Sequence, residues 1–299
     1  MSFKVLQGKI DAKNNPTVMG LDPKLEYVPE HIISEVTGEF GKTPKAAGEA
    51  IFRFNKGLID ACYDLVPAVK PQSAYYEMYG LEGLGALCRT VDYARSKGLY
   101  VILDAKRGDI GATCEAYSSA YLGGSMVFGE RAGFLDCDCL TVNPYLGRDG
   151  VQPFIDDCVK FGKSIFVLVK TSNKSSGDFQ DMKLAGGGTL YEHVARELIS
   201  WGEPDNIGAV VGATYSEQLA DLRGLMPRSF LLVPGFGAQG GAAADIRRAF
   251  DRNGGGAVVN SSRAIMCAWQ GKPGAGLNFG ECARDEVIRM RDALNEVRP

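Results

Sequence analysis

The sequence predicts an α/β protein that folds as a single (β/α)8 TIM barrel over residues 1–299. Eight short, β-branched apolar runs recur along the chain, and polar or glycine-rich stretches and helical patterns separate them. The chain of 299 residues is long enough for the roughly 250 residues of such a barrel with ordinary insertions. Because no internal repeat, low-complexity tract or Pro-rich linker interrupts the pattern, we expect one domain.

The predicted strands are nearly all apolar, as expected of parallel strands that are covered on both faces. They span residues 17–21, 66–70, 99–103, 139–142, 165–169, 208–211, 230–233 and 257–259. Apolar residues at helical spacing predict an outer ring of helices, the clearest of which span residues 49–63, 81–96, 190–201, 216–224, 242–253 and 282–297. The longest irregular stretch, 171–189, is predicted to be a functional loop.

Composition and charge exclude several classes of protein. With 45% hydrophobic and 23% charged residues, the chain is typical of a globular protein with a large core. A net charge of -3 gives no broad basic field, so we expect neither a nucleic acid nor a membrane as a partner. No run approaches about 20 apolar residues, which favours a cytoplasmic protein. The eight cysteines lack CxxC spacing and are expected to be reduced thiols.

Charged residues gather where two successive predicted strands end. Lys70 ends one of these strands, and Asp104, Lys106 and Asp109 follow the other. Barrels carry their active sites at the carboxyl ends of the strands, and residues two apart on a strand point the same way. Since adjacent strands lie about 4.8 Å apart, we expect Lys70, Asp104 and Lys106 to alternate in sign at the barrel mouth. From the charges alone, a structural ion network at the rim is an open alternative.

A glycine-rich segment, 234–241, follows the seventh predicted strand, and Arg263 follows the eighth. Barrels of this class commonly bind phosphate at these two strand ends. Backbone N–H groups around Gln239 and Gly240 can approach an anion, and the Arg263 guanidinium can donate two charge-assisted hydrogen bonds. The glycine segment by itself fits a tight turn as well. With Arg263 at the next strand end, it predicts a phosphate site.

The charged segment resembles the orotidine 5'-phosphate decarboxylase family. Its Asp-x-Lys-x-x-Asp-Ile motif is matched here by Asp104, Lys106, Asp109 and Ile110, with Thr113 following. Further matches, to the longer bacterial-type (type 2) subgroup, are PQSAYYE (71–77), DAKRGDIG (104–111), TVNPYLG (141–147), TSN (171–173) and PGFGAQGG (234–241). These segments occur in order across most of the chain, so the resemblance covers more than one motif.

The resemblance implies that the chain converts orotidine 5'-phosphate to uridine 5'-phosphate in pyrimidine biosynthesis, with no cofactor and no metal. It implies that Asp22 binds a ribose hydroxyl and that Lys70 contacts the ribose and the charge array. It also implies that Ser172 reads the pyrimidine edge, and that Gln239 and Arg263 hold the phosphate.

The resemblance further implies a homodimer with shared active sites, in which Asp109, Ile110 and Thr113 of one subunit enter the site of the other. Loss of carbon dioxide from C6 of the pyrimidine leaves a concentrated negative charge, which a nearby ammonium group stabilises. We therefore expect Lys106 to stabilise this charge and to donate a proton to C6. Carboxylates beside Lys106 would favour its protonated form.

Three other functions stay open from the residues. Lys70 or Lys106 could form a Schiff base, as in a class I aldolase. A metal-dependent relative similar to hexulose-phosphate synthase shares the Asp-x-Lys-x-x-Asp arrangement, although His31 and His193 are the only histidines available to a metal site. A barrel that has lost its activity would bind the nucleotide without turnover.

Overall fold

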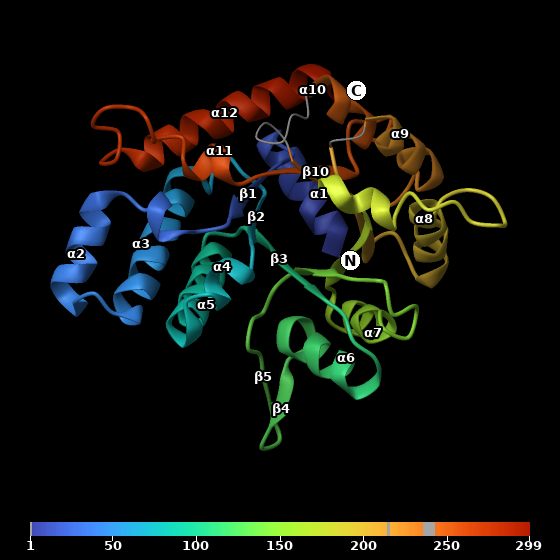
Figure 1. Cartoon of the computed structure of the whole chain (residues 1–299), viewed down its shortest axis with the longest axis horizontal. Coiled ribbons are helices and arrows are strands. Elements are labelled where there is room, and N and C mark those ends of the chain that lie inside the picture. Colours follow the sequence, from blue (N-terminus) through green and yellow to red (C-terminus); the bar gives the residue numbers. More distant parts are fainter. Residues whose placement is uncertain (1, 214–215, 236–242) are drawn as a thin grey trace.

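The chain forms a closed barrel of parallel strands surrounded by helices (Figure 1). The computed structural model describes residues 2–213, 216–235 and 243–299. Within these residues, eight strands close the barrel in the spatial order β1-β10-β9-β8-β7-β6-β3-β2. Their bounds are β1 (Thr17–Leu21), β2 (Ala68–Pro71), β3 (Tyr100–Arg107), β6 (Cys139–Val142), β7 (Ser164–Lys170), β8 (Ile207–Val211), β9 (Leu231–Pro234) and β10 (Ala257–Ser261). The predicted (β/α)8 barrel is confirmed.

The predicted strand boundaries agree with the structure to within two residues, except at one end. Strand β3 continues to Arg107, four residues beyond the predicted end at Leu103. Asp104 and Lys106 therefore lie within the strand, and not in the loop that follows it. Asp104 lies two residues beyond Ile102, which faces the barrel interior, so its side chain points the same way.

Helices surround the barrel and close one of its ends. The longer ones are α1 (Ser2–Lys13), α2 (Glu30–Phe40), α3 (Pro44–Cys62), α5 (Gly80–Ser96), α6 (Gly111–Ser118), α7 (Gln152–Phe161), α8 (Leu190–Trp201), α9 (Ser216–Leu225) and α12 (Phe279–Val297). Shorter turns are α4 (Ala74–Glu77), α10 (Ala243–Ile246), α11 (Arg263–Met266), η1 (Leu25–Tyr27), η2 (Ser119–Gly123), η3 (Lys174–Asp178) and η4 (Arg247–Ala249).

Capping residues explain where helices α3 and α8 begin, and a turn explains why the helix predicted over 242–253 is not continuous. Helix α3 begins five residues before the predicted start because Thr43 accepts a hydrogen bond from the Ala46 N–H. Helix α8 begins at the predicted residue behind a capping box of Thr189 and Glu192. The prediction of one helix over 242–253 was wrong: its described part is α10 followed by η4, and the chain then turns as Asp251 accepts hydrogen bonds from the following backbone.

Alternate residues of the strands build two separate cores. Inward-facing residues, among them Ala68, Tyr100, Ile102 and Phe166, form a cluster inside the barrel. The residues between them pack against the helices in a second, larger cluster. Helix α1 closes the barrel at the amino ends of the strands, where the Phe3 ring lies 4.8 Å from Phe166 and 5.0 Å from Phe230, centroid to centroid. The charged residues Lys70, Asp104 and Lys106 lie at the opposite end, where the carboxyl ends of the strands meet.

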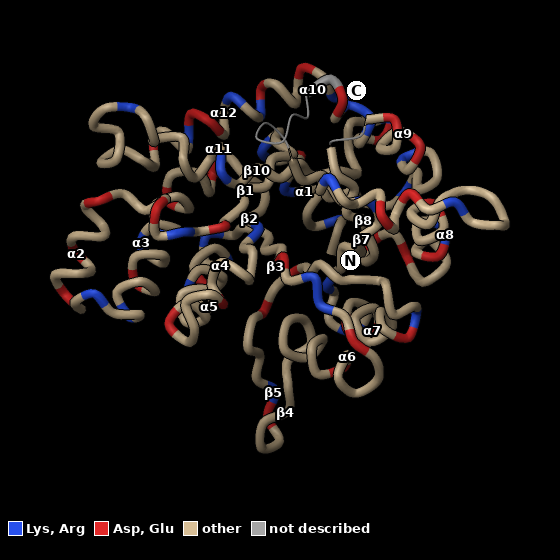
Figure 2. Tube along the Cα trace, in the orientation of Figure 1, with Lys and Arg blue, Asp and Glu red and all other residues tan. Residues whose placement is uncertain are grey.

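A small antiparallel hairpin of β4 (Ser125–Val127) and β5 (Glu130–Ala132) projects away from the barrel (Figure 1). Basic and acidic residues are interspersed along the outer helices, as α12 shows in Figure 2. No helix in the described residues is long and apolar enough to cross a membrane. The eight cysteines are all free thiols.

Candidate active site

The irregular end of β3 places two charged side chains inside the barrel mouth. The register between β3 and β6 shifts between Leu103 and Arg107, and Lys106 has a φ of 48°. A left-handed backbone is costly for a lysine and persists only where neighbours hold it. Here the Thr141 hydroxyl accepts hydrogen bonds from the N–H groups of Ala105 (3.0 Å) and Lys106 (2.9 Å). Thr141, from β6, therefore supports the strained turn.

Asp104 lies at the centre of a hydrogen-bonded charge array. Its Oδ2 accepts from Lys70 Nζ at 2.7 Å, and its Oδ1 accepts from Lys106 Nζ at 2.6 Å. The Thr141 hydroxyl donates to the same Oδ1 at 2.9 Å. The predicted alternation of ammonium, carboxylate and ammonium is present at the carboxyl ends of β2 and β3.

Burial strengthens the effect that each charge of this array has on the pKa of its neighbours. The side chains of Lys70 and Asp104 are 4% and 12% exposed, whereas that of Lys106 is 44% exposed. Burial opposes the charged form of Asp104, but the charges of Lys70 and Lys106 outweigh it and hold the pKa of this carboxyl well below its usual range. Burial likewise opposes the charge of Lys70, and the charges of Asp104 and Asp22 reverse this effect and raise its pKa. Both groups are therefore ionised at neutral pH.

One cavity of about 330 Å³ extends from the array toward β10. Asp22, which follows β1, and Arg263, the first residue of α11, line it together with Lys70 and Asp104. Asn260, near the end of β10, also faces this cavity. Within the described part of the chain, Oδ1 of Asp22 and Oδ1 of Asn260 are buried without a hydrogen-bond partner. Buried acceptors of this kind suit the hydroxyl groups of a ligand.

A second cavity of about 340 Å³ extends from the array toward β7. It shares Lys70, Asp104 and Pro234 with the first cavity and is also lined by Lys106 and Ser172. Its apolar walls come from residues of the barrel interior, namely Leu168, Val210 and Leu232. The structure thus brings Ser172 and Arg263 to opposite sides of the charge array. This arrangement can hold an extended molecule with one anionic end and one flat polar end.

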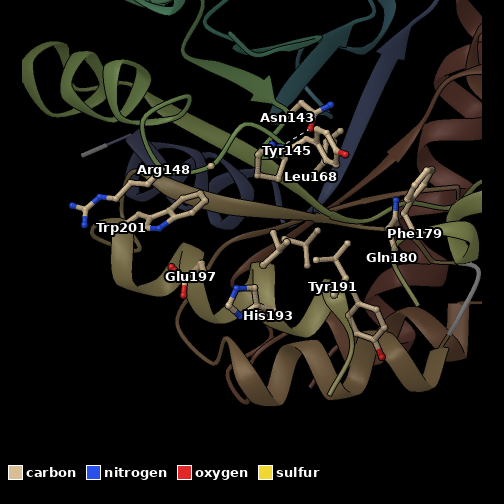
Figure 3. A pocket seen from close by; sticks show the side chains of 15 residues that line it. Asn143, Tyr145, Arg148, Leu168, Phe179, Gln180, Tyr191, His193, Glu197 and Trp201 are labelled. Atoms are coloured by element: carbon tan, nitrogen blue, oxygen red, sulfur yellow. Dashed lines mark hydrogen bonds between the residues drawn. The ribbon is translucent and has the colours of Figure 1, made fainter. Parts of the chain in front are cut away.

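A third hollow, of about 660 Å³, lies between β7, α8 and the segment after β6 (Figure 3). Asn143 and Arg148 line this hollow, and neither lines the two cavities beside the array. The side-chain oxygen of Asn143 accepts from the Tyr145 N–H at 3.0 Å, and Arg148 Nε donates to Gln152 Oε1 at 3.2 Å. Both residues therefore support the loop after β6.

Asp109, Ile110 and Thr113 make no ion pair or side-chain hydrogen bond with the array within the described residues. Asp109 accepts a hydrogen bond from the Ile110 N–H at 2.8 Å, and no ion pair joins it to Lys106 in the described residues. Ile110 is 54% exposed, and Thr113 is exposed as well. These residues surround the start of α6, on the surface of the chain. The predicted phosphate residues Gln239 and Gly240 lie outside the described residues.

Reasoning from the sequence missed two residues of the site. Thr141 is a polar residue at an inward position of an otherwise apolar strand, and this twofold pattern could have revealed it. Asn260 likewise interrupts the apolar run of β10. Both signals are single polar residues, and only the closed barrel shows what they contact.

Comparison with known proteins agrees with this geometry. Residues 52–272 match the model of a family described as "Orotidine 5'-phosphate decarboxylase / HUMPS family". The chain is 48% identical over 290 residues to orotidine 5'-phosphate decarboxylase of Rhodopirellula baltica, covering 93% of each protein. It is 40% identical over 291 residues to the enzyme of the same name from Clostridium acetobutylicum, covering 95% of this chain and 96% of that protein.

A solved structure supports the same assignment. The OMP decarboxylase of Leishmania donovani superimposes with a TM-score of 0.74 at 29% identity, and the match covers 97% of this chain and 98% of that one. The family match covers more than half of the sequence, and the array and both cavities lie on the shared barrel. The chain belongs to the orotidine 5'-phosphate decarboxylase / HUMPS family.

Proposed function

We propose that this chain removes carbon dioxide from orotidine 5'-phosphate to give uridine 5'-phosphate, without a metal or an organic cofactor. One observation carries the proposal: the array of Lys70, Asp104 and Lys106 lies where two cavities meet, with Arg263 on one side and Ser172 on the other. A nucleotide that spans both cavities would have its reacting carbon over the array.

In the proposed pose, the substrate extends from β10 to β7. Its phosphate lies by Arg263, with Gln239 and Gly240 as further predicted contacts, and its ribose lies by Asp22 and Lys70. Its pyrimidine faces Ser172 in the second cavity. The unpartnered Oδ1 atom of Asp22 supports a hydroxyl contact, and the apolar walls of the second cavity support a planar ring.

Lys106 and Asp104 would carry the chemistry. The bond between C6 and the carboxylate breaks, carbon dioxide leaves, and the electron pair stays on C6 until Lys106 Nζ transfers a proton there. The Lys106 amine then recovers a proton from water. Asp104 keeps Lys106 in place and would repel the substrate carboxylate in the ground state. Two like charges 4 Å apart repel by about 4 kcal/mol at an effective dielectric of 20.

The array favours this chemistry over a Schiff base. A lysine must lose its proton before it attacks a carbonyl group, whereas Asp104 and Asp22 raise the pKa of the buried Lys70. Lys106 is ion-paired with Asp104 at 2.6 Å. A class I aldolase would need at least one of these amines to be neutral.

An absorbance assay with orotidine 5'-phosphate tests the proposal. We expect turnover by the wild-type chain to be unchanged by a chelator. In Lys106→Ala we expect turnover to fall at least about 10³-fold, because the variant loses both the stabilising charge and the proton donor. Loss of activity in chelator would instead favour a metal-dependent synthase. A covalent adduct trapped by borohydride would favour the aldolase, and binding of uridine 5'-phosphate without turnover would favour a barrel that has lost its activity.

The homodimer and the cytoplasmic location stay predictions. The exposure of Ile110 and Thr113 at the start of α6 supports a site that is completed by Asp109, Ile110 and Thr113 of a second subunit. Mixing Lys106→Ala chains with Asp109→Ala chains should restore part of the activity, because one site of each mixed dimer then has both residues. Absence of recovery in verified mixed dimers would contradict the shared site.

A further inference from the structure

Lys170, at the end of β7, forms a buried ion pair outside the charge array. Its side chain is 1% exposed, and its Nζ lies 2.7 Å from Asp181 Oδ1 and 3.1 Å from Ser176 Oγ. Asp181 also accepts a hydrogen bond from Gln218 of α9 at 3.4 Å. Burying a lysine carries a large desolvation cost, and such pairs are weak sources of stability. The position of the pair therefore suggests a role in fixing the segment that starts at the next residue.

A second anchor lies beside the first. The Thr171 N–H donates to Gln180 Oε1 at 2.9 Å, and Gln180 Nε2 donates to the Thr171 hydroxyl at 2.8 Å. Gln180 lies next to Phe179 at the edge of the hollow beside β7 (Figure 3). Residues 171–181 thus form a loop whose two ends are tied to each other and to β7.

Ser172 is held between these anchors and the end of β8. A Cβ atom on Gly212 would lie 2.9 Å from the N, Cα and Cβ atoms of Ser172, so only glycine allows this close approach. Ser172 lines the second cavity, beside Lys106. Lys170 and Gln180 line neither of the two cavities next to the array. The hydrogen bonds that Lys170 donates to Ser176 and Asp181, and those that Gln180 makes with Thr171, all lead into the loop that carries Ser172.

We propose that Lys170 and Gln180 are positioning residues that hold Ser172 against the pyrimidine in the second cavity. This inference rests on the proposed function, and in particular on the proposed contact of Ser172 with the substrate. Most other residues of the loop are exposed. A misplacement of about 1 Å in a positioned group can lower a rate about 100-fold.

A double-mutant cycle of Lys170→Met and Ser172→Ala tests this inference. Methionine fills the space of the lysine stem, and Asp181 keeps Gln218 as a partner. We expect Lys170→Met alone to lower kcat/KM for orotidine 5'-phosphate by about 10- to 100-fold. In the Ser172→Ala background, Lys170→Met should lower kcat/KM less than about twofold, because a residue that acts only through the Ser172 side chain then has nothing left to position. An equal loss in both backgrounds would overturn the inference.

Lys163→Met is the matched control. Lys163 is also buried and ion-paired, to Asp136 at 2.6 Å, but it precedes β7 at the opposite end of the barrel. We expect this variant to lower Tm and to leave kcat/KM within about twofold of wild type. A large loss of kcat/KM in Lys163→Met would show that any buried pair on β7 matters, and would overturn the specific role of Lys170.

Gln180→Ala provides a second cycle if Lys170→Met does not fold. It removes both hydrogen bonds to Thr171 from a partly exposed position and should also lose its effect in the Ser172→Ala background. If the wild-type chain shows no turnover, the proposed function itself fails. If wild type turns over and both cycles are additive, only the positioning role is rejected.

Discussion

Replacing Asp104 by asparagine would test whether one buried carboxylate holds the active site together. Asp104 lies 2.7 Å from Lys70 Nζ and 2.6 Å from Lys106 Nζ, and the pair with Lys70 is almost inaccessible to solvent. Removing one partner of a buried pair costs about 3–5 kcal/mol. Because asparagine keeps a hydrogen-bonding oxygen, we expect the lower value of about 3 kcal/mol. For a chain of this size that lowers Tm by about 6 °C.

The kcat of Asp104→Asn should fall even at temperatures where the variant is fully folded. Lys106 loses the anion that orients its ammonium group, and the substrate carboxylate loses a repulsive neighbour. Removing one preorganised electrostatic group lowers kcat by about 10²- to 10³-fold. We expect this range in the absorbance assay, at temperatures well below the Tm of the variant.

The pH dependence of stability gives an independent signature. In the wild type the pKa of Lys70 is raised, so its contribution is complete below the unfolded value of about 10.4 and is lost only as the pH rises through the folded value. Burial is already the largest single influence on this pKa, and without the Asp104 charge it is no longer outweighed, so the pKa of Lys70 falls. The unfolded state then binds more protons than the folded state. Asp104→Asn should therefore gain stability from pH 7 toward pH 10, whereas the wild type should not.

Thermal unfolding followed by circular dichroism at several pH values measures both effects. Asp64→Asn is the control, because Asp64 pairs with Arg284 at 2.6 Å before β2, at the opposite end of the barrel, and both side chains are more than a third exposed. It should change Tm little and leave kcat unchanged. A Tm within about 2 °C of wild type for Asp104→Asn, which at this size corresponds to only about 1 kcal/mol, together with an unchanged pH slope, would refute the reasoning.

Two further substitutions test packing away from the reacting groups, one at the closed end of the barrel and one between β1 and the start of α11. Phe3→Ala should lower Tm by about 6 °C, because the ring fills the closed end of the barrel against Phe166 and Phe230, and kcat at 25 °C should be unchanged. A loss of kcat without a loss of Tm would contradict a purely structural role for α1. Gly20→Ala should raise KM about tenfold, since its Cβ would lie 1.9 Å from Ser262 Oγ and displace the residue before Arg263. An unchanged KM would show that the start of α11 does not position the phosphate site.

Local sequence was sufficient to predict the barrel and the centre of its site. Apolar runs are required wherever a parallel strand is covered on both faces, so the eight strands are visible in the sequence. Twofold alternation along the predicted strand then places Asp104 and Lys106 on one face, and Lys70 lies at the carboxyl end of the neighbouring strand. These inferences need only periodicity and the rule that barrel sites lie at the carboxyl ends of strands.

Tertiary structure decided the contacts between residues that lie far apart in the sequence. Thr141 supports the Lys106 backbone from 35 residues away, and Asn260 reaches the Asp22 cavity only because β10 and β1 close the barrel. Lys170 could be predicted to end a strand, but its pairing with Asp181 depends on how an irregular loop folds back. Periodicity fixes the direction in which a side chain points, whereas its partner is fixed by closure of the barrel and by the path of its loops.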